Sequence, residues 1–452
     1  MKQKMDTSRL RVIDLFTGCG GFSYGFQLAG LQIETGIEIN KKACYTASYN
    51  LFWKHGIRRD HVNKNIEDVS AEYLKLDSGL TKITIGGPPC QAYSRIGQPK
   101  LRSLGEERYG LRDKRAFLYK EFIRLGVELD SAAIVMENVP ESVNFFGINI
   151  PQIVCEILEQ NGYNAIWTIL NAADYGVPQT RERVFVIAIK KEIGNVVYLP
   201  EPSHFNSLGL TGREILAKYK RMTEFENFRL PLVAEENAPR WVTVYDALSD
   251  LPVLFPSSNS KYVLRKIETK LPYQTPPINE FQKKMRMKSD GSYTTMVDAN
   301  CFRNTPRDFR IFERMDHGDN YSDAHKIALE LFYDACRYYG ISEEDEEEYN
   351  KLFKEYVPPY DTTKFLSKWK RLDPDKPSHT LVAHLGTDTY SHIHPFEPRG
   401  ISVREAARLQ SFPDDFSFNS SSMSDAFKQI GNAVPPLLAK AVAEAVIKNL
   451  NK

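Results

Sequence analysis

The sequence predicts an α/β fold in which a mostly parallel sheet is covered by helices on both faces. Short apolar runs alternate with helical stretches through the first 190 residues. This alternation, with runs rich in Val and Ile, is typical of parallel strands buried on both faces. The strands are expected at 10–16, 32–39, 82–85, 132–136 and 184–189, and a first helix is expected at 23–29.

Residues able to bind ligands or carry out chemistry follow these strands. The first expected strand runs into a glycine-rich turn that contains Gly18, and the second ends in Glu38. Gly86-Gly87-Pro88-Pro89 stops the third strand directly before Cys90, and Glu137 stops the fourth. Because ligands bind beyond the carboxyl ends of strands in such sheets, we expect a site at this edge.

The composition excludes several classes of protein. The 452 residues, 42% of them hydrophobic, are enough for two or three domains with real cores. No run approaches 18 consecutive apolar residues, and the first eleven residues lack the apolar segment of a secretion signal, so no membrane span or export is expected. The six Cys form no CxxC pair, which favours reduced thiols in a cytoplasm over a zinc site, so no metal is expected.

The middle of the chain differs from both ends, because prolines cluster from about residue 195 and strand and helix signals weaken. The formal net charge of the whole chain is only +1, but residues 256–310 hold 11 Lys and Arg against 5 acids. Residues 311–358 reverse this balance, with 5 basic and 13 acidic side chains. A local basic face can bind nucleic acid even when the total charge is near zero. The acidic run Glu343–Glu348 is interpreted first as a solvated helix face or loop, with a regulatory or DNA-mimicking role as the alternative.

The last ninety residues return to α/β character. Ser402 and Glu405 have the spacing of a capping box, which predicts a short helix that runs to Gln410 and stops at Phe412-Pro413. A final helix is expected over 437–450.

The glycine-rich turn favours a nucleoside ligand. Glu38 follows Gly18 by 20 residues, a spacing that suits a second-strand acid bound to ribose hydroxyls. The turn departs from GxGxxG and has no P-loop lysine, so S-adenosylmethionine fits better than a pyrophosphate. The alternative is a tight turn with no ligand.

The other motifs offer a nucleophile and charged partners for it. Cys90 is presented by a rigid Gly-Pro turn, and an ordinary thiol is already a few per cent thiolate at neutral pH. Glu137 is costly to bury unless it is hydrogen-bonded or protonated, and a protonated carboxyl can donate to a ring nitrogen such as N3 of cytosine. Arg181 and Arg183 project to one side of an extended segment, where they bind a base carbonyl and a phosphate or pair with Glu137 and Glu182.

Together these motifs closely resemble the cytosine-C5 DNA methyltransferase family of the bacterial restriction-modification type. The ordered blocks between residues 12 and 440 are DLFTGCGGF, GGPPCQAYS, MENV, YGVPQTRERVFV, REAARLQSFPDDF and QIGNAVPP. The resemblance implies a Rossmann-like S-adenosylmethionine-dependent methyltransferase core with a smaller, mixed target-recognition domain. It divides the chain into a catalytic and cofactor-binding domain at 1–195, a target-recognition domain at 196–375, and a return to the catalytic domain at 376–452.

The resemblance also gives roles to single residues. It makes Cys90 the nucleophile that attacks C6 of cytosine, with Glu137 on N3 and the exocyclic amine, Arg183 on O2, and Arg181 in support. The expected ligands of S-adenosylmethionine are Phe16, Gly18, Gly20, Gly21, Phe22, Glu38, Ile39, Asn65, Ile66, Pro89, Leu118, Asn432 and Val434. The C-terminal segment with Gly431, Asn432, Ala433 and Val434 is expected to return and pack beside the first motif, where it completes the cofactor pocket.

Double-stranded DNA is the implied substrate, and the target base must be flipped out of the duplex. Residues 91–115 carry seven Lys and Arg against three acids and are expected to form a mobile catalytic loop. Its candidate DNA-binding residues are Ser94, Arg95, Gln98 and Lys100. Base edges are expected to be read from the major groove by the middle region, most of all by 256–310.

The sequence departs from the family pattern at two positions of the expected cofactor site. Asn65 stands where an acid is common, and Ile39 stands where an aromatic residue is common, which puts only the affinity for the cofactor in doubt. Three alternative functions remain open: an RNA (tRNA) cytosine-C5 methyltransferase, a non-catalytic DNA-binding relative, and, from the fold alone, a dinucleotide-dependent dehydrogenase.

Only about ten residues precede the first motif, which favours a bacterial or phage modification enzyme without an N-terminal regulatory domain. Such an enzyme is expected to act as a monomer in the bacterial cytoplasm or nucleoid. It is expected to protect host DNA from a cognate restriction endonuclease that is a functional rather than a physical partner.

Overall fold

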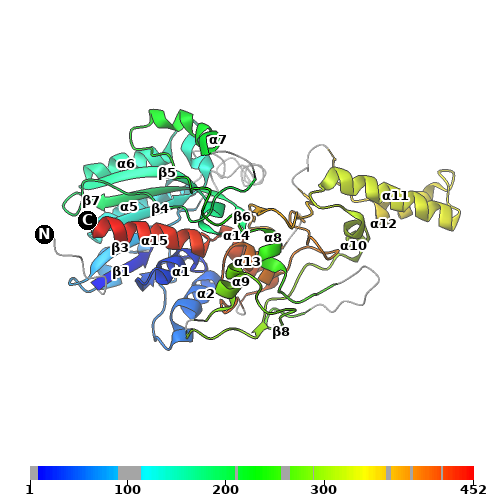
Figure 1. Cartoon of the computed structure of the whole chain (residues 1–452), viewed down its shortest axis with the longest axis horizontal. Coiled ribbons are helices and arrows are strands. Elements are labelled where there is room, and N and C mark those ends of the chain that lie inside the picture. Colours follow the sequence, from blue (N-terminus) through cyan, green and yellow to red (C-terminus); the bar gives the residue numbers. More distant parts are fainter. Residues whose placement is uncertain are drawn as a thin grey trace. The chain divides into compact units, whose positions relative to one another are not determined.

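The computed structural model describes residues 9–89, 114–208, 212–255, 265–288, 290–362, 368–386, 390–418 and 421–451. The chain forms two compact units (Figure 1). The first unit comprises Met1–Trp241, Gln410–Phe412 and Ala433–Lys452, and the second comprises Val242–Leu409 and Pro413–Asn432.

A six-stranded sheet organises the first unit. Its strand order is β2-β1-β3-β4-β7-β5, with bounds Gln32–Gly36, Leu10–Asp14, Thr81–Gly86, Ala133–Asn138, Glu182–Lys190 and Tyr163–Asn171. β1 pairs in parallel with β2 and β3, and β3 with β4, whereas β7 runs antiparallel to both β4 and β5. The predicted α/β fold with a mostly parallel sheet is therefore confirmed, and β5 is a strand that the sequence reading missed.

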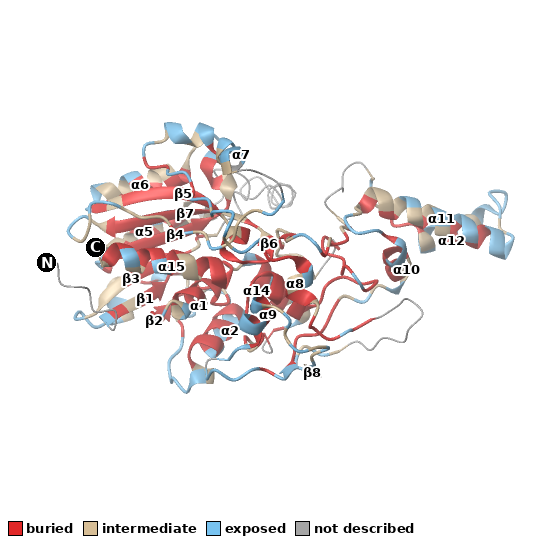
Figure 2. Cartoon of the chain, viewed as in Figure 1, coloured by how far each residue is buried: buried red, intermediate tan, exposed pale blue. Residues whose placement is uncertain are grey.

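Helices cover this sheet on both faces, as Figure 2 shows by the burial of its strands. All six residues of β4 are buried, which requires apolar neighbours above and below the strand. One set of helices, α5 and α6, shares a core cluster with Ile134, Trp167 and Val186. A second set, α1 and α15, packs together and also contacts the sheet. The helix bounds are Gly21–Leu28 for α1, Lys41–Leu51 for α2, Ala71–Leu74 for α3, Leu118–Glu128 for α5, Ile150–Gln160 for α6, Gly212–Ala217 for α7 and Pro436–Leu450 for α15.

Short elements complete the first unit and place several site residues. They are the 3-10 turns η2 Trp53–His55, η3 Ile66–Asp68, η6 Lys114–Phe117, η7 Pro140–Asn144, η8 Ala172–Tyr175 and η9 Lys220–Glu224, and the two-residue strand β6 Gln179–Thr180.

The first unit extends beyond the predicted boundary at residue 195. Trp167 of β5 packs against Phe228 with ring centroids 4.6 Å apart, and its main-chain N–H donates to the Asn227 carbonyl at 2.9 Å. Trp241 donates its indole N–H to Asp174 at 2.9 Å. Because of these contacts, the first compact unit extends to Trp241. Toward the C-terminus, most of residues 376–432 belong to the second unit. The functional names given to the three predicted domains stay predictions.

Helices and buried charge pairs build the second unit. Its elements are α8 Val244–Leu248, β8 Leu271–Pro272, α9 Glu280–Arg286, β9 Met296–Val297, α10 Pro306–Arg314, α11 Tyr321–Tyr339, α12 Glu346–Tyr356, β10 Ser378–His379, α13 Val403–Leu409 and α14 Met423–Asn432. The predicted capping box is confirmed, because the Ser402 N–H donates to Glu405 at 2.7 Å and the Glu405 N–H donates to the Ser402 hydroxyl at 3.2 Å. The 19-residue helix α11 was not predicted.

Three buried arginines of this unit pair with carboxylates and main-chain carbonyls of its irregular segments. Arg408 bridges Asp250 and Asp414, Arg404 pairs with Asp298, and Arg399 pairs with two glutamates. Each guanidinium also donates to main-chain carbonyls or holds carboxylates that accept from the main chain. Irregular segments can stay buried only when their polar groups are paired in this way.

One segment, Met423–Leu450, is long and apolar enough to cross a membrane by length and composition, but 67% of its most apolar window is buried inside the structure. The segment consists of α14 and α15, which are separate helices on either side of Ala433–Pro435. α15 packs on α1 and β7 as a core helix of the first unit, so the segment is weak support for a membrane span.

The contact between α1 and α15 depends on Gly25. A Cβ at this position would lie 2.6 Å from the Pro436 carbonyl oxygen and would also clash with the Cβ of Ala439. Because Gly25 lies inside α1, its replacement by Ala would ordinarily favour the helix by about 1 kcal/mol. Steric overlap with α15 outweighs this gain.

We expect Gly25→Ala to destabilise the first unit by about 1–3 kcal/mol, because the two helices must move apart. Thermal unfolding and urea denaturation measure the change. Gly194→Ala is the matched control, since a Cβ there would meet only the Asn449 carbonyl oxygen at 3.9 Å. A Gly25→Ala protein as stable as the control would show that the two helices are not in close contact.

Candidate active site

The edge where β4 ends and β7 begins brings a carboxylate and a guanidinium together. The antiparallel register places Glu137 opposite Phe185 and Asn138 opposite Val184. Arg183, the next residue of β7, therefore reaches Glu137, and its Nε lies 2.9 Å from Oε1 of that residue. Their side chains are only 12% and 11% exposed, so the pair is largely withdrawn from water.

Burial dominates the electrostatics of Glu137. It raises the pKa of the Glu137 carboxyl, while the charges of Arg183 and Arg181 and the hydrogen bond from Arg183 oppose that shift. A carboxyl in this environment can take up a proton more readily than one in water. The pair can therefore offer hydrogen-bond donors to a polar ligand from both partners.

The turn before Cys90 lies against Glu137. A Cβ on Gly87 would sit 2.9 Å from Oε2 of Glu137, so only a glycine leaves room for the carboxylate in its present position. Asn138 donates its amide N–H to the Pro88 carbonyl at 3.4 Å, which ties the same turn to the end of β4. The turn that leads to Cys90 therefore lies beside Glu137. Cys90 itself, like Ser94, Arg95, Gln98 and Lys100, lies outside the described residues.

The segment before β7 is connected to the returning C-terminal chain. Arg181 is buried, and its Nη2 donates to the Ala433 carbonyl at 3.3 Å. Gln179 donates to the Gln410 amide oxygen at 2.6 Å, and Gln410 donates to the same Ala433 carbonyl at 2.6 Å. Arg181 therefore joins the start of β7 to the returning C-terminal chain, and Arg183 contacts Glu137.

The first glycine-rich turn has an open side. Gly18 has a φ of 55°, in the left-handed region, and among the described residues no heavy atom lies within 4 Å of the position of a Cβ there. Its N–H donates to Oε2 of Glu38 at 2.9 Å, and the N–H of Asn40 donates to Oε1 at 2.7 Å. These bonds hold the Glu38 carboxylate beside the turn, and a carboxylate oxygen is the kind of acceptor that a ribose hydroxyl needs.

The C-terminal segment packs on this turn as the sequence predicted for Ala433 and Val434. A Cβ on Gly21 would lie 2.7 Å from the Val434 carbonyl oxygen and 3.1 Å from the Ala433 Cβ. Asn432, the remaining candidate from this motif, ends α14 in the second unit and has an exposed side chain. Gly20, with a φ of 96°, is closed off by Ala47 and Leu51 of α2.

The other expected cofactor ligands differ in how accessible they are. Ile39 is 69% exposed, and Phe16 is half-buried above Gly86. Phe22 is buried, with edge contacts to Phe26 and Phe185, so it is a core residue. Ile66 and Val434 are buried, whereas Pro89 and Leu118 are half-buried. Asn65 accepts from the Glu67 N–H and donates to the Glu67 carboxylate at 2.8 Å, which places it at the start of η3.

Asp14 is a buried acid that the sequence reading gave no role. Its carboxylate accepts from the Ser23 hydroxyl at 2.7 Å and from the Phe16 N–H at 3.3 Å. Burial raises the pKa of Asp14 to about 7, and the bond from Ser23 limits the shift. These bonds fix the turn that carries Phe16 and Gly18. An acid at the end of an apolar strand was the signal for it in the sequence.

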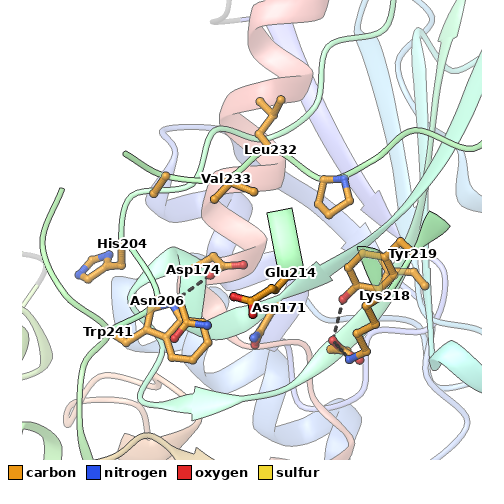
Figure 3. A pocket seen from close by; sticks show the side chains of 14 residues that line it. Asn171, Asp174, His204, Asn206, Glu214, Lys218, Tyr219, Leu232, Val233 and Trp241 are labelled. Atoms are coloured by element: carbon orange, nitrogen blue, oxygen red, sulfur yellow. Dashed lines mark hydrogen bonds and ion pairs between the residues drawn. The ribbon is translucent and has the colours of Figure 1, made fainter. Parts of the chain in front are cut away.

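A polar pocket of about 170 Å³ lies where β5 ends and β7 begins (Figure 3). Its lining combines the acids Asp174, Glu182 and Glu214 with Lys218, and its aromatic residues are Tyr219 and Trp241. Burial raises the pKa of Asp174 to about 7, while the hydrogen bond from Trp241 lowers it. Four of these residues come from 212–241, outside the predicted catalytic domain.

A group of possible metal ligands lies in the second unit. The ligand atoms of His394, Glu397 and Glu405 lie within 4.8 Å of one another. Arg399 donates to both carboxylates at 2.7 Å and so supplies the positive charge that a cation would bring. These residues therefore form a structural ion-pair cluster.

Comparisons with known proteins agree with the geometry of the first unit. The family model for C-5 cytosine-specific DNA methylase matches residues 10–448. The chain is 54% identical over 444 residues to an Oceanobacillus iheyensis sequence named as type II methyltransferase M.OihORF3336P, covering 97% of this chain and 95% of the relative. It is 31% identical over 462 residues to type II methyltransferase M.AgeI of Thalassovita gelatinovora, covering 97% and 99%.

A solved structure supports the fold. The crystal structure of a DNA modification methyltransferase encoded within an Escherichia coli prophage aligns with a TM-score of 0.65 and 23% identity, covering 98% of this chain and all of the other. The family model, the two relatives and this fold lead to one assignment: the chain belongs to the C-5 cytosine-specific DNA methylase family.

Proposed function

We propose that this enzyme, a DNA (cytosine-5) methyltransferase by its family, holds a flipped cytosine at the Glu137–Arg183 pair and attacks its C6 with Cys90. The observation that carries the proposal is the position of Gly87. This residue of the turn that leads to Cys90 fits against the Glu137 carboxylate, and Arg183 contacts the same carboxylate from β7. The turn that leads to Cys90 and two groups that can bind a base thus lie at one edge of the sheet.

In the proposed chemistry, Glu137 and Arg183 offset the negative charge that develops on the cytosine ring. The bond between Cys90 Sγ and C6 forms as the C5–C6 π electrons move toward C5, and negative charge also develops on the ring and its carbonyl. Glu137 offsets that charge by donating a proton or hydrogen bond to N3, and Arg183 donates to O2. C5 takes up the methyl group as the S–CH3 bond of the donor breaks and its sulfonium becomes a neutral thioether. Water then removes the C5 proton, the electrons of that bond restore the C5–C6 double bond as the Cys90 thiolate leaves, and any proton given to N3 returns to Glu137.

Methyltransferases of this family use S-adenosylmethionine, and the first unit has groups that fit it. Gly18 leaves open space at the turn, the Glu38 carboxylate beside it is an acceptor of the kind that ribose hydroxyls need, and Phe16 and Ile39 offer apolar surface to adenine. When bound, S-adenosylmethionine supplies the methyl group that C5 takes up. The Asp14 carboxylate accepts from the Phe16 N–H and so fixes the position of Phe16.

Double-stranded DNA is the proposed substrate, and the second unit is the proposed reader of its sequence. Arg95 and Gln98 of the basic segment 91–115 are proposed to fill the space left by the flipped base, and Ser94 and Lys100 are proposed to bind the DNA. The flip costs a few kcal/mol of stacking and pairing, which these contacts must offset. The names of the type II methyltransferase relatives support a role in protecting host DNA from a cognate restriction endonuclease. We also propose that the enzyme acts in the cytoplasm as a monomer.

The decisive experiment measures transfer of a labelled methyl group from S-adenosylmethionine to DNA and to tRNA in parallel. We expect transfer to DNA only, at the C5 position of cytosine, and bisulfite sequencing of the product identifies the site. Transfer to tRNA alone would support the RNA methyltransferase alternative. Absence of transfer to DNA of any sequence would exclude the proposed function.

Cys90→Ser should lose methyl transfer while it retains cofactor binding near normal, because a serine hydroxyl is a far weaker nucleophile than a thiolate at neutral pH. Filter assays of methylation and calorimetric titration with S-adenosylmethionine measure the two properties. Cys155→Ser is the matched control, since Cys155 is a buried cysteine of α6 in the core of the unit. Full turnover by Cys90→Ser would contradict the role of the thiol.

Gly87→Ala should lower kcat by about 100-fold, because the new Cβ displaces the Glu137 carboxylate and small misplacements of reacting groups are costly. The fold and cofactor binding should be unaffected. Adding Glu137→Asp shortens the carboxyl side chain and should not restore the rate, because the shorter side chain withdraws from the base. A Gly87→Ala enzyme with the kcat of the Gly194→Ala control would show that the turn does not depend on this contact.

A further inference from the structure

Glu182 lies between the two arginines of the QTRER motif but faces away from them. In an extended segment, neighbouring side chains point to opposite sides, so Glu182 cannot join the Glu137–Arg183 pair. Its Oε1 instead accepts from the Lys218 ammonium at 2.5 Å and from the Tyr219 hydroxyl at 2.6 Å (Figure 3). The motif is thereby attached to the 212–224 segment, which has no role in the proposed chemistry.

The main chain of the same residue contacts Arg183. The Glu182 carbonyl accepts from Nη1 of Arg183 at 2.6 Å, while Nε of Arg183 is 2.9 Å from Glu137. A guanidinium presents its donors in a rigid plane, so these two bonds together fix its orientation. With Nη1 directed to the Glu182 carbonyl, Arg183 cannot turn its Nη1–Nη2 edge toward Glu137 and pair with it end-on.

The two donors that hold Glu182 differ in strength. Lys218 is 58% exposed and Glu182 is 30% exposed, so their ion pair by itself contributes little to stability. Tyr219 is buried, and burial raises the pKa of its phenol, so the hydroxyl keeps its proton and remains a donor. A buried hydrogen bond to a carboxylate contributes more to stability than an exposed one and has a defined direction.

We propose that Glu182, held by Tyr219 and Lys218, is a positioning residue that orients the guanidinium of Arg183 toward Glu137 and the target base. The proposal rests on the proposed function of the Glu137–Arg183 pair. Glu182 touches neither the base nor the cofactor. Its side chain anchors the first residue of β7, and its carbonyl then holds Arg183. The segment 212–224 thus supports base binding without reaching the base.

Glu182→Ala should lower kcat for DNA methylation by at least about 10-fold and leave the affinity for S-adenosylmethionine unchanged. Glu182→Gln should stay within about threefold of wild type, because its amide oxygen still accepts from Tyr219 and Lys218. Tyr219→Phe should have an intermediate effect. Lys220→Ala, which removes an exposed neighbouring lysine, is the control and should match wild type.

A double-mutant cycle with Arg183→Lys separates positioning from a general loss of stability. If Glu182 acts through Arg183, Glu182→Ala should lower kcat by less than about twofold in the Arg183→Lys background. If the fold-losses of kcat in the two single variants multiply in the double variant, the proposal is overturned. It is also overturned if the loss of kcat in Glu182→Ala is fully explained by the fraction of that protein that is unfolded in thermal melts. If Glu182→Ala has the wild-type kcat while Arg183→Lys is impaired, the positioning role of Glu182 is wrong but the proposed function stands. If Arg183→Lys and Glu137→Gln are both fully active, the proposed function itself is refuted.

Discussion

The reversed direction of β7 is the constraint on which the site depends. In a wholly parallel sheet, the residue that starts a strand lies at the opposite edge from the residue that ends its neighbour. Because β7 is antiparallel to β4, its first residues lie beside the last residues of β4, and Arg183 meets Glu137. A carboxylate as buried as Glu137 requires such a partner, since an unpaired buried charge costs several kcal/mol. Because side chains alternate along β7, the neighbouring Glu182 points to the opposite side from Arg183, where Tyr219 donates to it.

Close approaches of the backbone let distant parts of the chain meet at this edge. Gly87 makes room for Glu137, Gly21 for the Val434 carbonyl, and Gly25 for α15. The Ala433 carbonyl accepts from both Arg181 and Gln410, so the returning C-terminal chain is joined to the start of β7 as well as to the first turn. A change in any one of these contacts therefore displaces groups that come from three regions of the sequence.

Much of this arrangement could be predicted from the sequence, and the rest could not for identifiable reasons. Apolar runs and ordered motifs predicted the strands, the family and Glu137, Arg181 and Arg183 as charged groups of one site. β5 and α11 had local signals that were missed: an apolar run after Gly162 for β5, and a capping box at Asn320 with a C-terminal Gly340 for α11. The bonds from Tyr219 to Glu182 and from Ser23 to Asp14 depend on tertiary packing, which no local pattern encodes.

The structure also changes how the charge of the middle region is understood. Its basic count includes arginines that are used internally: Arg286 pairs with Asp250 and stacks on Tyr273, and Arg307 pairs with Asp308. The exposed basic side chains of the described part of 256–310 are lysines, namely Lys266, Lys270, Lys283, Lys284 and Lys288. Lysines bind phosphates as flexible point charges, whereas planar arginines suit bidentate contacts to guanine. If the second unit reads DNA as proposed, these exposed lysines suit contacts to the phosphate backbone better than bidentate contacts to bases.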